Sequence, residues 1–304
     1  MKNALILILI SFALLSCGSE KSTTDTNKLH VVTTTGMIAD VVRNVGKDSV
    51  VVNALMGPGV DPHLYKATQG DLGRLRKADV IFYNGLHLEG KMGEVFEKLE
   101  RIKTVVPVAR GVDNSFLIDN PVFQGSHDPH IWFDVRLWSA TIGEVTSTLI
   151  ASDPESQAYY EQNALAYTKS LQELHDWVIL EIQKIPKDKR LMVTAHDAFS
   201  YFGRAYDIEV RGLQGISTLS EFGLKDRVDL VNFIVERKVK AVFIETSVSQ
   251  KNINAIVEGC RQKGHNVIIG GNLFSDAMGA EGTPTGEYIG MVRANVKTIV
   301  EALR

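Results

Sequence analysis

The chain has 304 residues, of which 44% are hydrophobic and 23% charged, and its formal net charge is -3. At about 100–200 residues per domain this length allows two domains, and the apolar content is that of a globular protein with a sizeable core. The near balance of charges argues against a nucleic-acid-binding protein, which would carry a basic excess. The two cysteines, Cys17 and Cys260, are too few for a four-cysteine zinc module, an iron–sulfur cluster or a disulfide framework.

The N-terminal residues are typical of a signal sequence. Lys2 precedes a nearly unbroken apolar run from Ala4 to Leu15, which is shorter than the ~20 residues that a membrane-spanning helix needs. The run ends in Leu-Leu-Ser-Cys, which resembles a bacterial lipobox. We therefore predict that residues 1–16 are removed and that Cys17 is acylated, so that lipid alone holds the protein at the membrane. A plain signal peptide with an incidental cysteine is the alternative. Residues 17–28 are polar and aperiodic, as expected for a tether.

Beyond the tether, strands and helices alternate, and this alternation predicts a mostly parallel sheet flanked by helices. The predicted strands are His30–Thr34, Val50–Met56, Val80–Tyr83 and Thr104–Val108, and the predicted helices are Gly36–Val45, Thr68–Ala78, Gly90–Leu99 and Val135–Ile150. We expect residues 111–128 to form an irregular loop. The segment 29–151 is accordingly predicted to be an N-terminal α/β lobe.

A long helix is predicted over residues 152–186. Ser152 to Glu155 has the spacing of a capping box, and apolar residues then recur at steps of three and four up to Pro186. His175 is expected on the exposed side of this helix. At 1.5 Å per residue, about thirty helical residues in this segment would span roughly 45 Å, which suits a rigid connection between two lobes. An ordinary long helix inside one domain is the alternative.

The same alternation returns after Pro186 and predicts a C-terminal α/β lobe over residues 187–304. The predicted strands are Arg190–Thr194, Ile208–Leu213, Ala241–Glu245 and Asn266–Ile269, and the predicted helices are Ala198–Ala205, Leu224–Lys238, Asn252–Lys263 and Glu287–Leu303.

Four polar residues lie after predicted strands or at the end of the irregular loop. Open α/β sheets bind ligands where strands end and loops begin. His63 and His130 each end an Asp-Pro-His tripeptide, His196 follows a strand directly, and Asp276 lies in the loop after the strand Asn266–Ile269. Proline stiffens the backbone before each tripeptide histidine. Any one loop histidine is more often a surface residue than a ligand. Together, three imidazoles and a carboxylate would suit Zn²⁺ or another divalent first-row ion.

Five segments resemble the signature segments of the TroA-like (cluster A-I) family, the metal-binding receptors of bacterial zinc and manganese ABC importers. They are GVDPHLYKAT, NGLHLEGKM, DPHIWFDV, TAHDAF and GNLFSDAMG, in the family's order. The resemblance implies two α/β lobes joined by one rigid helix, with His63, His130, His196 and Asp276 binding the metal in the cleft between them. It also implies a monomeric, lipid-anchored protein on the extracytoplasmic side of a membrane, with an ABC permease as its partner. Manganese-selective relatives often have Glu where this chain has His196, whereas many zinc receptors have a histidine-rich loop where this chain has only His127.

The leading hypothesis is therefore a receptor without catalytic activity that captures Zn²⁺ or Mn²⁺. A metal-dependent hydrolase is the main alternative, but four protein ligands leave little room for substrate at a catalytic zinc. An adhesin-type surface lipoprotein involved in cell adhesion is a third hypothesis, which rests only on surface anchoring and on how such lipoproteins are sometimes named. His87 is expected to be structural, and some carboxylates near the ligands are expected to orient imidazoles. The candidates for that role are Asp61, Asp128, Asp134, Asp197, Glu221 and Glu245.

Overall fold

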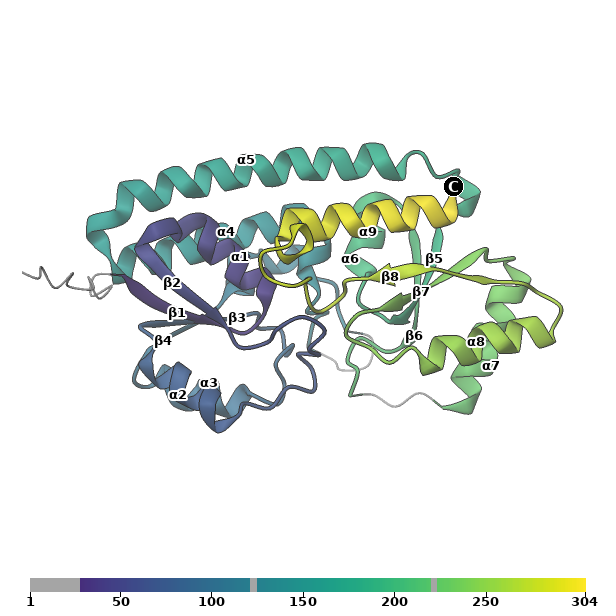
Figure 1. The fold of residues 1–304 in the computed structure, drawn as a ribbon, viewed down its shortest axis with the longest axis horizontal. Helices are drawn as coiled ribbons and strands as arrows, with labels where there is room; N and C mark the ends of the chain where they lie inside the picture. Colours follow the sequence, from purple (N-terminus) through teal and green to yellow (C-terminus); the bar gives the residue numbers. More distant parts are fainter. Residues whose placement is uncertain (1–27, 121–124, 220–222) are drawn as a thin grey trace, which may run out of the picture.

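The computed structural model describes residues 28–120, 125–219 and 223–304. The signal sequence, Cys17 and Glu221 lie outside the described residues. Two α/β lobes stand side by side beneath one long helix that runs along both (Figure 1), which confirms the predicted fold class. Within the described residues, no helix has the length and apolar character needed to cross a membrane.

The N-terminal lobe is built on a four-stranded parallel sheet of order β2-β1-β3-β4. Its strands are β1 (Leu29–Thr33), β2 (Val50–Ala54), β3 (Val80–Tyr83) and β4 (Thr104–Pro107), and its helices are α1 (Gly36–Gly46), α2 (Gln69–Lys77), α3 (Gly93–Glu100) and α4 (Val135–Ser152). In Figure 1, α1 and α4 lie between this sheet and the long helix, and α2 and α3 cover the other face. All the predicted strands and helices of this lobe are present, with shifts of one to three residues at most ends.

The C-terminal lobe repeats the same strand order in a second parallel sheet, β6-β5-β7-β8. Its strands are β5 (Leu191–His196), β6 (Glu209–Gln214), β7 (Ala241–Glu245) and β8 (Ile268–Leu273), and its helices are α6 (Ser200–Tyr206), α7 (Leu224–Glu236), α8 (Lys251–Gln262) and α9 (Tyr288–Leu303). In each sheet the order in which successive strands are added reverses between the two central strands, β1 and β3 in the first sheet and β5 and β7 in the second. This is the point at which open α/β sheets bind ligands beyond the carboxyl ends of their strands.

The long helix α5 (Gln157–Ile182) has 26 residues, or about 39 Å, and begins later than predicted. The predicted capping box is wrong because α4 continues through Ser152, whose hydroxyl donates to the carbonyl of Thr148. A short 3-10 turn at Pro154–Ser156 then separates the two helices. The prediction that His175 is exposed is also wrong, since this side chain is 5% exposed. Position 175 belongs to the apolar stripe of α5, and its Nδ1 lies 3.1 Å from the hydroxyl of Tyr206.

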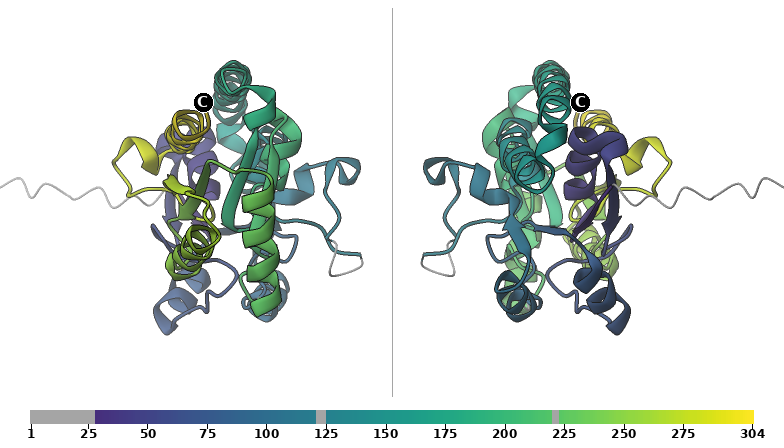
Figure 2. Two further views of the ribbon diagram at one scale, coloured as in Figure 1. Left: turned by 90° about the vertical axis from the view of Figure 1, so that its right-hand side faces the viewer. Right: turned by 90° about the vertical axis from the view of Figure 1, so that its left-hand side faces the viewer.

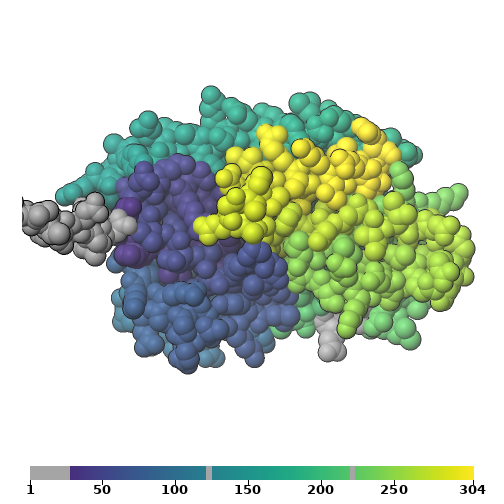
Figure 3. Space-filling view, in the orientation of Figure 1, coloured from purple at the N-terminus to yellow at the C-terminus, as the bar shows by residue number. Residues whose placement is uncertain are grey.

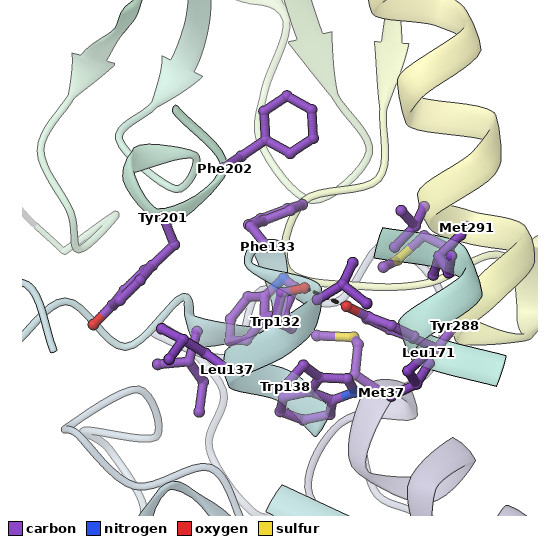
Figure 4. Close-up of a cluster of buried hydrophobic side chains, with 14 of the residues drawn as sticks. Met37, Trp132, Phe133, Leu137, Trp138, Leu171, Tyr201, Phe202, Tyr288 and Met291 are labelled. Atoms are coloured by element: carbon purple, nitrogen blue, oxygen red, sulfur yellow. Dashed lines mark hydrogen bonds between the residues drawn. The ribbon is translucent and has the colours of Figure 1, made fainter. Parts of the chain in front are cut away.

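The largest hydrophobic core does not stop at the boundary between the lobes. It joins α1, α4, α5 and α9 in one cluster of buried side chains, in which Trp132, Trp138, Leu171 and Tyr288 are fully buried (Figure 4). A smaller core fills the opposite face of each sheet. The lobes are therefore fused through their helical layer, since the same apolar cluster draws on both.

Polar contacts reinforce this junction at the start of α9. Asp40 on α1 accepts hydrogen bonds from the Tyr167 hydroxyl on α5 and from the backbone N–H of Tyr288. The segment that precedes α9 also reaches the N-terminal lobe, where Glu281 lies 2.8 Å from Arg43. In Figure 3 this C-terminal segment covers part of the boundary between the lobes.

Candidate metal centre

The structure brings the four predicted residues together in the cleft between the lobes. His63 lies in the loop after β2, His130 just before α4, His196 at the end of β5, and Asp276 in the loop after β8. One potential ligand atom from each residue lies within 4.8 Å of the others. All four side chains are buried, with exposed fractions between 0% and 2%. Each lobe contributes two of the four residues.

The spacing of the four side chains is that of ligands around a small cation. The Nε2 atoms of His63 and His130 are 3.3 Å apart. Asp276 Oδ2 lies 3.2 Å from His196 Nε2 and 3.7 Å from His63 Nε2, and its Oδ1 lies 3.6 Å from His130 Nε2. Nitrogen and oxygen ligands about 2.0–2.1 Å from a tetrahedral zinc ion are separated by about 3.3 Å. The geometry therefore fits a divalent ion at the centre of the cluster.

Three buried polar atoms at the centre also point to a cation. Both carboxylate oxygens of Asp276 and the Nε2 of His196 have no hydrogen-bond partner of good geometry among the described residues, although two of these atoms are close to each other. Buried polar atoms in folded proteins nearly always have a partner. A bound metal ion would supply one partner to all three atoms.

The two Asp-Pro-His tripeptides form the same local turn. In each, the first carboxylate oxygen of the aspartate accepts a 2.9 Å hydrogen bond from the backbone N–H of the histidine, Asp61 from His63 and Asp128 from His130. Asp128 Oδ1 also lies 2.7 Å from Nδ1 of the His130 ring. The proline between the two residues restricts the backbone, so each histidine is presented from a stiff turn. The carboxylate beside Nδ1 leaves Nε2 of His130 available to a metal.

His196 is held at the reversal point of the second sheet. It ends β5, and Glu245 ends the neighbouring strand β7. The two oxygens of Glu245 contact the backbone N–H of His196 at 2.9 Å and the ring Nδ1 at 2.5 Å. Because both contacts come from one buried carboxylate, the imidazole ring is fixed with Nε2 directed at Asp276.

The backbone around Asp276 is held from both lobes. The side-chain amide of Asn295 on α9 bonds both the N–H and the carbonyl of Phe274. From the N-terminal lobe, the Trp132 indole donates to the carbonyl of Ser275 at 3.0 Å, and its ring lies 5.2 Å from that of His130. Trp132 therefore couples the positions of one candidate ligand from each lobe.

The electrostatics of the cluster prepare it for a cation. Burial lowers the pKa of His63 to about 3, with Asp276 opposing this shift and His130 and His196 adding to it. Burial would also lower the pKa of His196, but the carboxylates of Asp276 and Glu245 outweigh it and raise that pKa well above its usual range. Burial disfavours ionised Asp276, yet the three imidazoles lower its pKa overall. At neutral pH the metal-free centre thus contains an ionised carboxylate, a neutral His63 and a protonated His196, which must release its proton before its Nε2 can bind a metal.

The carboxylates near the ligands have different roles. Asp128 and Glu245 contact imidazole rings, as predicted for part of the group. Asp61 instead accepts a hydrogen bond from the Thr218 hydroxyl of the other lobe at 2.6 Å. Asp134 accepts from a backbone N–H at the start of α4, and Asp197 accepts from the Ser200 hydroxyl.

Besides Trp132 and Asn295, sequence reasoning missed Asn84 and Thr218 as residues that position the candidate ligands or their neighbours. Asn84 follows β3 at the reversal point of the first sheet, and its side chain donates to the carbonyl of Pro129, next to His130. The strand-end criterion could have found Asn84, because it applies to amides as well as to histidines. Thr218, which bonds Asp61 across the cleft, lies in a loop that carries no such signal.

A buried cluster of three histidines and one aspartate between two α/β lobes defines the class of two-lobed metal-binding proteins. Comparison with known proteins names the family. The family model "Zinc-uptake complex component A periplasmic" matches residues 31–302. The chain therefore belongs to the ZnuA family of metal ABC transporter substrate-binding proteins.

Individual relatives match over nearly their whole length. The chain is 47% identical over 296 residues to the manganese-binding lipoprotein MntA of Bacillus subtilis, covering 97% of this chain and 96% of MntA. It is 48% identical over 286 residues to the zinc-binding protein TroA of Treponema pallidum, covering 94% and 92%. The solved structure of that periplasmic zinc-binding protein matches with a TM-score of 0.88, covering 91% of this chain and 99% of the other.

Proposed function

We infer that this protein is the extracytoplasmic metal-binding receptor of an ABC importer, which captures Zn²⁺ or Mn²⁺ and delivers it to a membrane permease. The observation that carries this inference is the buried cluster of His63, His130, His196 and Asp276, drawn equally from two lobes. Membership of the ZnuA family and the names of MntA and TroA support the same function. The metal ion is the cargo of this receptor.

We propose that His63, His130 and His196 bind the ion through Nε2 and that Asp276 binds it through its carboxylate. The tetrahedral spacing and the imidazole-rich donor set suit zinc. Both oxygens of Asp276 face the imidazoles, which also allows the higher coordination number that manganese takes. Zinc exceeds manganese in intrinsic affinity for such donors, so selection between the two would depend on metal supply.

The proposal also covers the lipid anchor, the domain boundaries and the absence of catalytic activity. Acylation of Cys17 would hold the receptor at the outer side of the membrane, with residues 17–28 as a tether and 1–16 as the signal. The lobes would comprise 29–151 and 187–304, with 152–186 connecting them in a monomer. We also propose that the protein is not an enzyme, because four protein ligands at a closed site leave no position for a reacting water.

Calorimetric titration of the mature protein without its lipid tests the ligand assignment. Zn²⁺ and Mn²⁺ are each titrated into the wild type, into His130→Ala and into His30→Ala, a control at an exposed position at the other end of the sheet. We expect His130→Ala to lower affinity by about a hundredfold or more and the control to leave it unchanged. Equal affinity in all three proteins would refute the assignment. The assignment also requires that the wild type bind one ion per chain.

A further inference from the structure

A cavity of about 360 Å³ borders the metal centre at His63 and is also lined by two histidines outside the four proposed ligands. His63 forms one wall of this cavity, and His87 and His127 form others. Exposure falls along this series, because His87 is exposed, the His127 side chain is 29% exposed and His63 is 2% exposed. An ion approaching through this cavity would meet imidazoles before it reached the buried centre.

The position of His127 is fixed by a short antiparallel pairing of two chain segments. His127 pairs with Asp119, and the N–H of Asp128 donates to the carbonyl of Ile118. Tyr201 from the other lobe ties both segments, since its hydroxyl bonds the Ile118 N–H and the Asp128 carbonyl. Asp119 Oδ1 lies 3.2 Å from Nδ1 of His127. Asp128 and Glu245 make hydrogen-bond contacts to the rings of His130 and His196, whereas the exposed Asp119 is near Nδ1 of His127 without a hydrogen bond to it. The chain pairing, rather than a carboxylate, therefore places His127 at the cavity wall.

The position of His87 is fixed by an unusual backbone segment. Three successive residues have positive φ, namely Gly85 (85°), Leu86 (53°) and His87 (64°). Non-glycine residues seldom adopt this conformation, and it persists only where the surroundings hold it. Here the buried carboxylate of Glu89 accepts hydrogen bonds from the backbone N–H groups that precede Leu86, at Asn84 and Gly85. The fold thus holds His87 at the cavity wall in a conformation that a free loop would avoid.

A second cavity near the centre provides a contrast. It has a volume of about 420 Å³, is lined by Asp276, Arg43 and Glu281 among others, and has no histidine among its described lining residues. Figure 2 shows that the segments bordering the two cavities, 112–120 with 125–128 and 274–287, project from opposite sides of the molecule. Among the described lining residues, imidazole nitrogens that suit Zn²⁺ therefore line the cavity at His63, and none lines the cavity at Asp276.

We propose that His87 and His127 form a loading site in which they bind the incoming Zn²⁺ transiently before it passes to His63. In this exchange an imidazole nitrogen forms a bond to the ion as a water ligand leaves, and no electron or proton transfer is needed. The ion would thus lose its hydration shell stepwise rather than at the buried centre in one step. This inference rests on the proposed receptor function and concerns how the same centre is filled.

The test compares the association rate constant for Zn²⁺ with the equilibrium Kd. A loading site changes the association rate constant and leaves the Kd unchanged. The double variant His87→Asn/His127→Gln removes both imidazoles, and asparagine tolerates the positive φ at position 87. Binding of Zn²⁺ alone is followed by stopped-flow tryptophan fluorescence, for which Trp132 beside His130 provides a signal. We expect an association rate constant about tenfold lower and an equilibrium Kd within about twofold of the wild type. The dissociation rate constant must then fall by the same factor.

His30→Gln, which removes an exposed histidine remote from the cavity, is the matched control and should bind at the wild-type rate. An unchanged association rate in the double variant would overturn the loading site. So would a tenfold weaker Kd with an unchanged association rate, since that would make His87 or His127 a ligand of the final centre. Failure of the wild type to bind either Zn²⁺ or Mn²⁺ would instead refute the receptor function itself, so the two failures are distinguishable.

Discussion

The two lobes meet in two regions of opposite chemistry. Along the helical layer, α1, α4, α5 and α9 share one apolar core that includes Trp138 and Leu174. In the cleft, the contacts are those of the candidate metal centre and of polar pairs such as Asp61 with Thr218. The apolar junction is complete without any ligand. The polar junction contains three buried imidazoles and a carboxylate, and a bound cation would supply a partner to those of their atoms that have no hydrogen bond among the described residues.

The contrast between the two junctions indicates how a receptor of this kind could release its cargo without opening widely. Separation of the helical layer would expose a large apolar surface to water, at about 25 cal/mol for each Å² exposed. Separation of the cleft would expose polar groups that water can solvate. We therefore expect the metal-bound and metal-free states to differ near the cleft, while the helical layer stays intact.

The largest expected effect comes from filling the polar junction. A ligand that binds only the native state stabilises it by RT ln(1 + [L]/Kd), which is about 4 kcal/mol when Zn²⁺ is at a thousandfold excess over Kd. Urea denaturation with and without Zn²⁺ should show this gain in the wild type. With a Kd weakened a hundredfold or more, His130→Ala should show a gain of only about 1.4 kcal/mol or less at the same Zn²⁺ concentration. An equal gain in that variant would show that the ion stabilises the protein from another place.

A cavity created by mutation in the apolar junction should lower the stability of the protein without changing its affinity for the metal. Leu174→Ala removes a fully buried side chain of α5 and should lower the free energy of unfolding by about 2–5 kcal/mol. Leu165→Ala on the same helix removes a side chain that is 74% exposed and serves as the control. The Kd for Zn²⁺ of the Leu174 variant should stay near that of the wild type. A large change in Kd would mean that the two junctions are coupled.

The smallest effect is expected at Asp40, the polar group inside the apolar junction. Burial raises the pKa of this carboxyl, while hydrogen bonds from Tyr167, Tyr288 and Asn44 offset part of the shift. A raised folded-state pKa means that the native protein holds the proton more tightly than the unfolded chain. This contribution to stability is complete below the unfolded pKa of about 3.9 and is lost as pH rises through the folded pKa.

Urea denaturation at several pH values, compared with Asp40→Asn, isolates this contribution. The free energy of unfolding of the wild type relative to the variant should decrease between about pH 4 and pH 7, because the variant has no proton to lose at this position. A relative stability that increases with pH would contradict the assigned direction of the pKa shift. Neither protein should change its Kd for Zn²⁺ at neutral pH.

Much of the fold and site could be predicted because the relevant signals are local. Alternating strand and helix patterns indicate parallel sheets, and the carboxyl ends of parallel strands share one edge. That is why His63, His196 and Asp276 could be singled out before their distances were known. The contact between Asp61 and Thr218 spans 157 residues, and that between Asp40 and Tyr288 spans 248. No local pattern encodes such pairs.

The errors at the long helix have a local cause. The Ser152–Glu155 spacing matches a capping box, but the preceding helix extends to Ser152 and uses its hydroxyl. His175 is polar, yet it lies four residues after Leu171 and three before Val178 on the buried stripe. Residue type alone predicts that His175 is exposed, whereas its helical position predicts burial. The contact with Tyr206 that makes this burial tolerable comes from the C-terminal lobe.

The place of α9 in the junction has a consequence for the order of folding. Tyr288 begins this helix, and its hydroxyl bonds the carbonyl of Trp132 while its N–H bonds Asp40. The core of the N-terminal half therefore stays incomplete until the chain has been made as far as α9, at about 5–20 residues per second. For the exported receptor proposed above, this delay would keep the nascent chain from closing its core early and leave it extended enough to be threaded through a membrane.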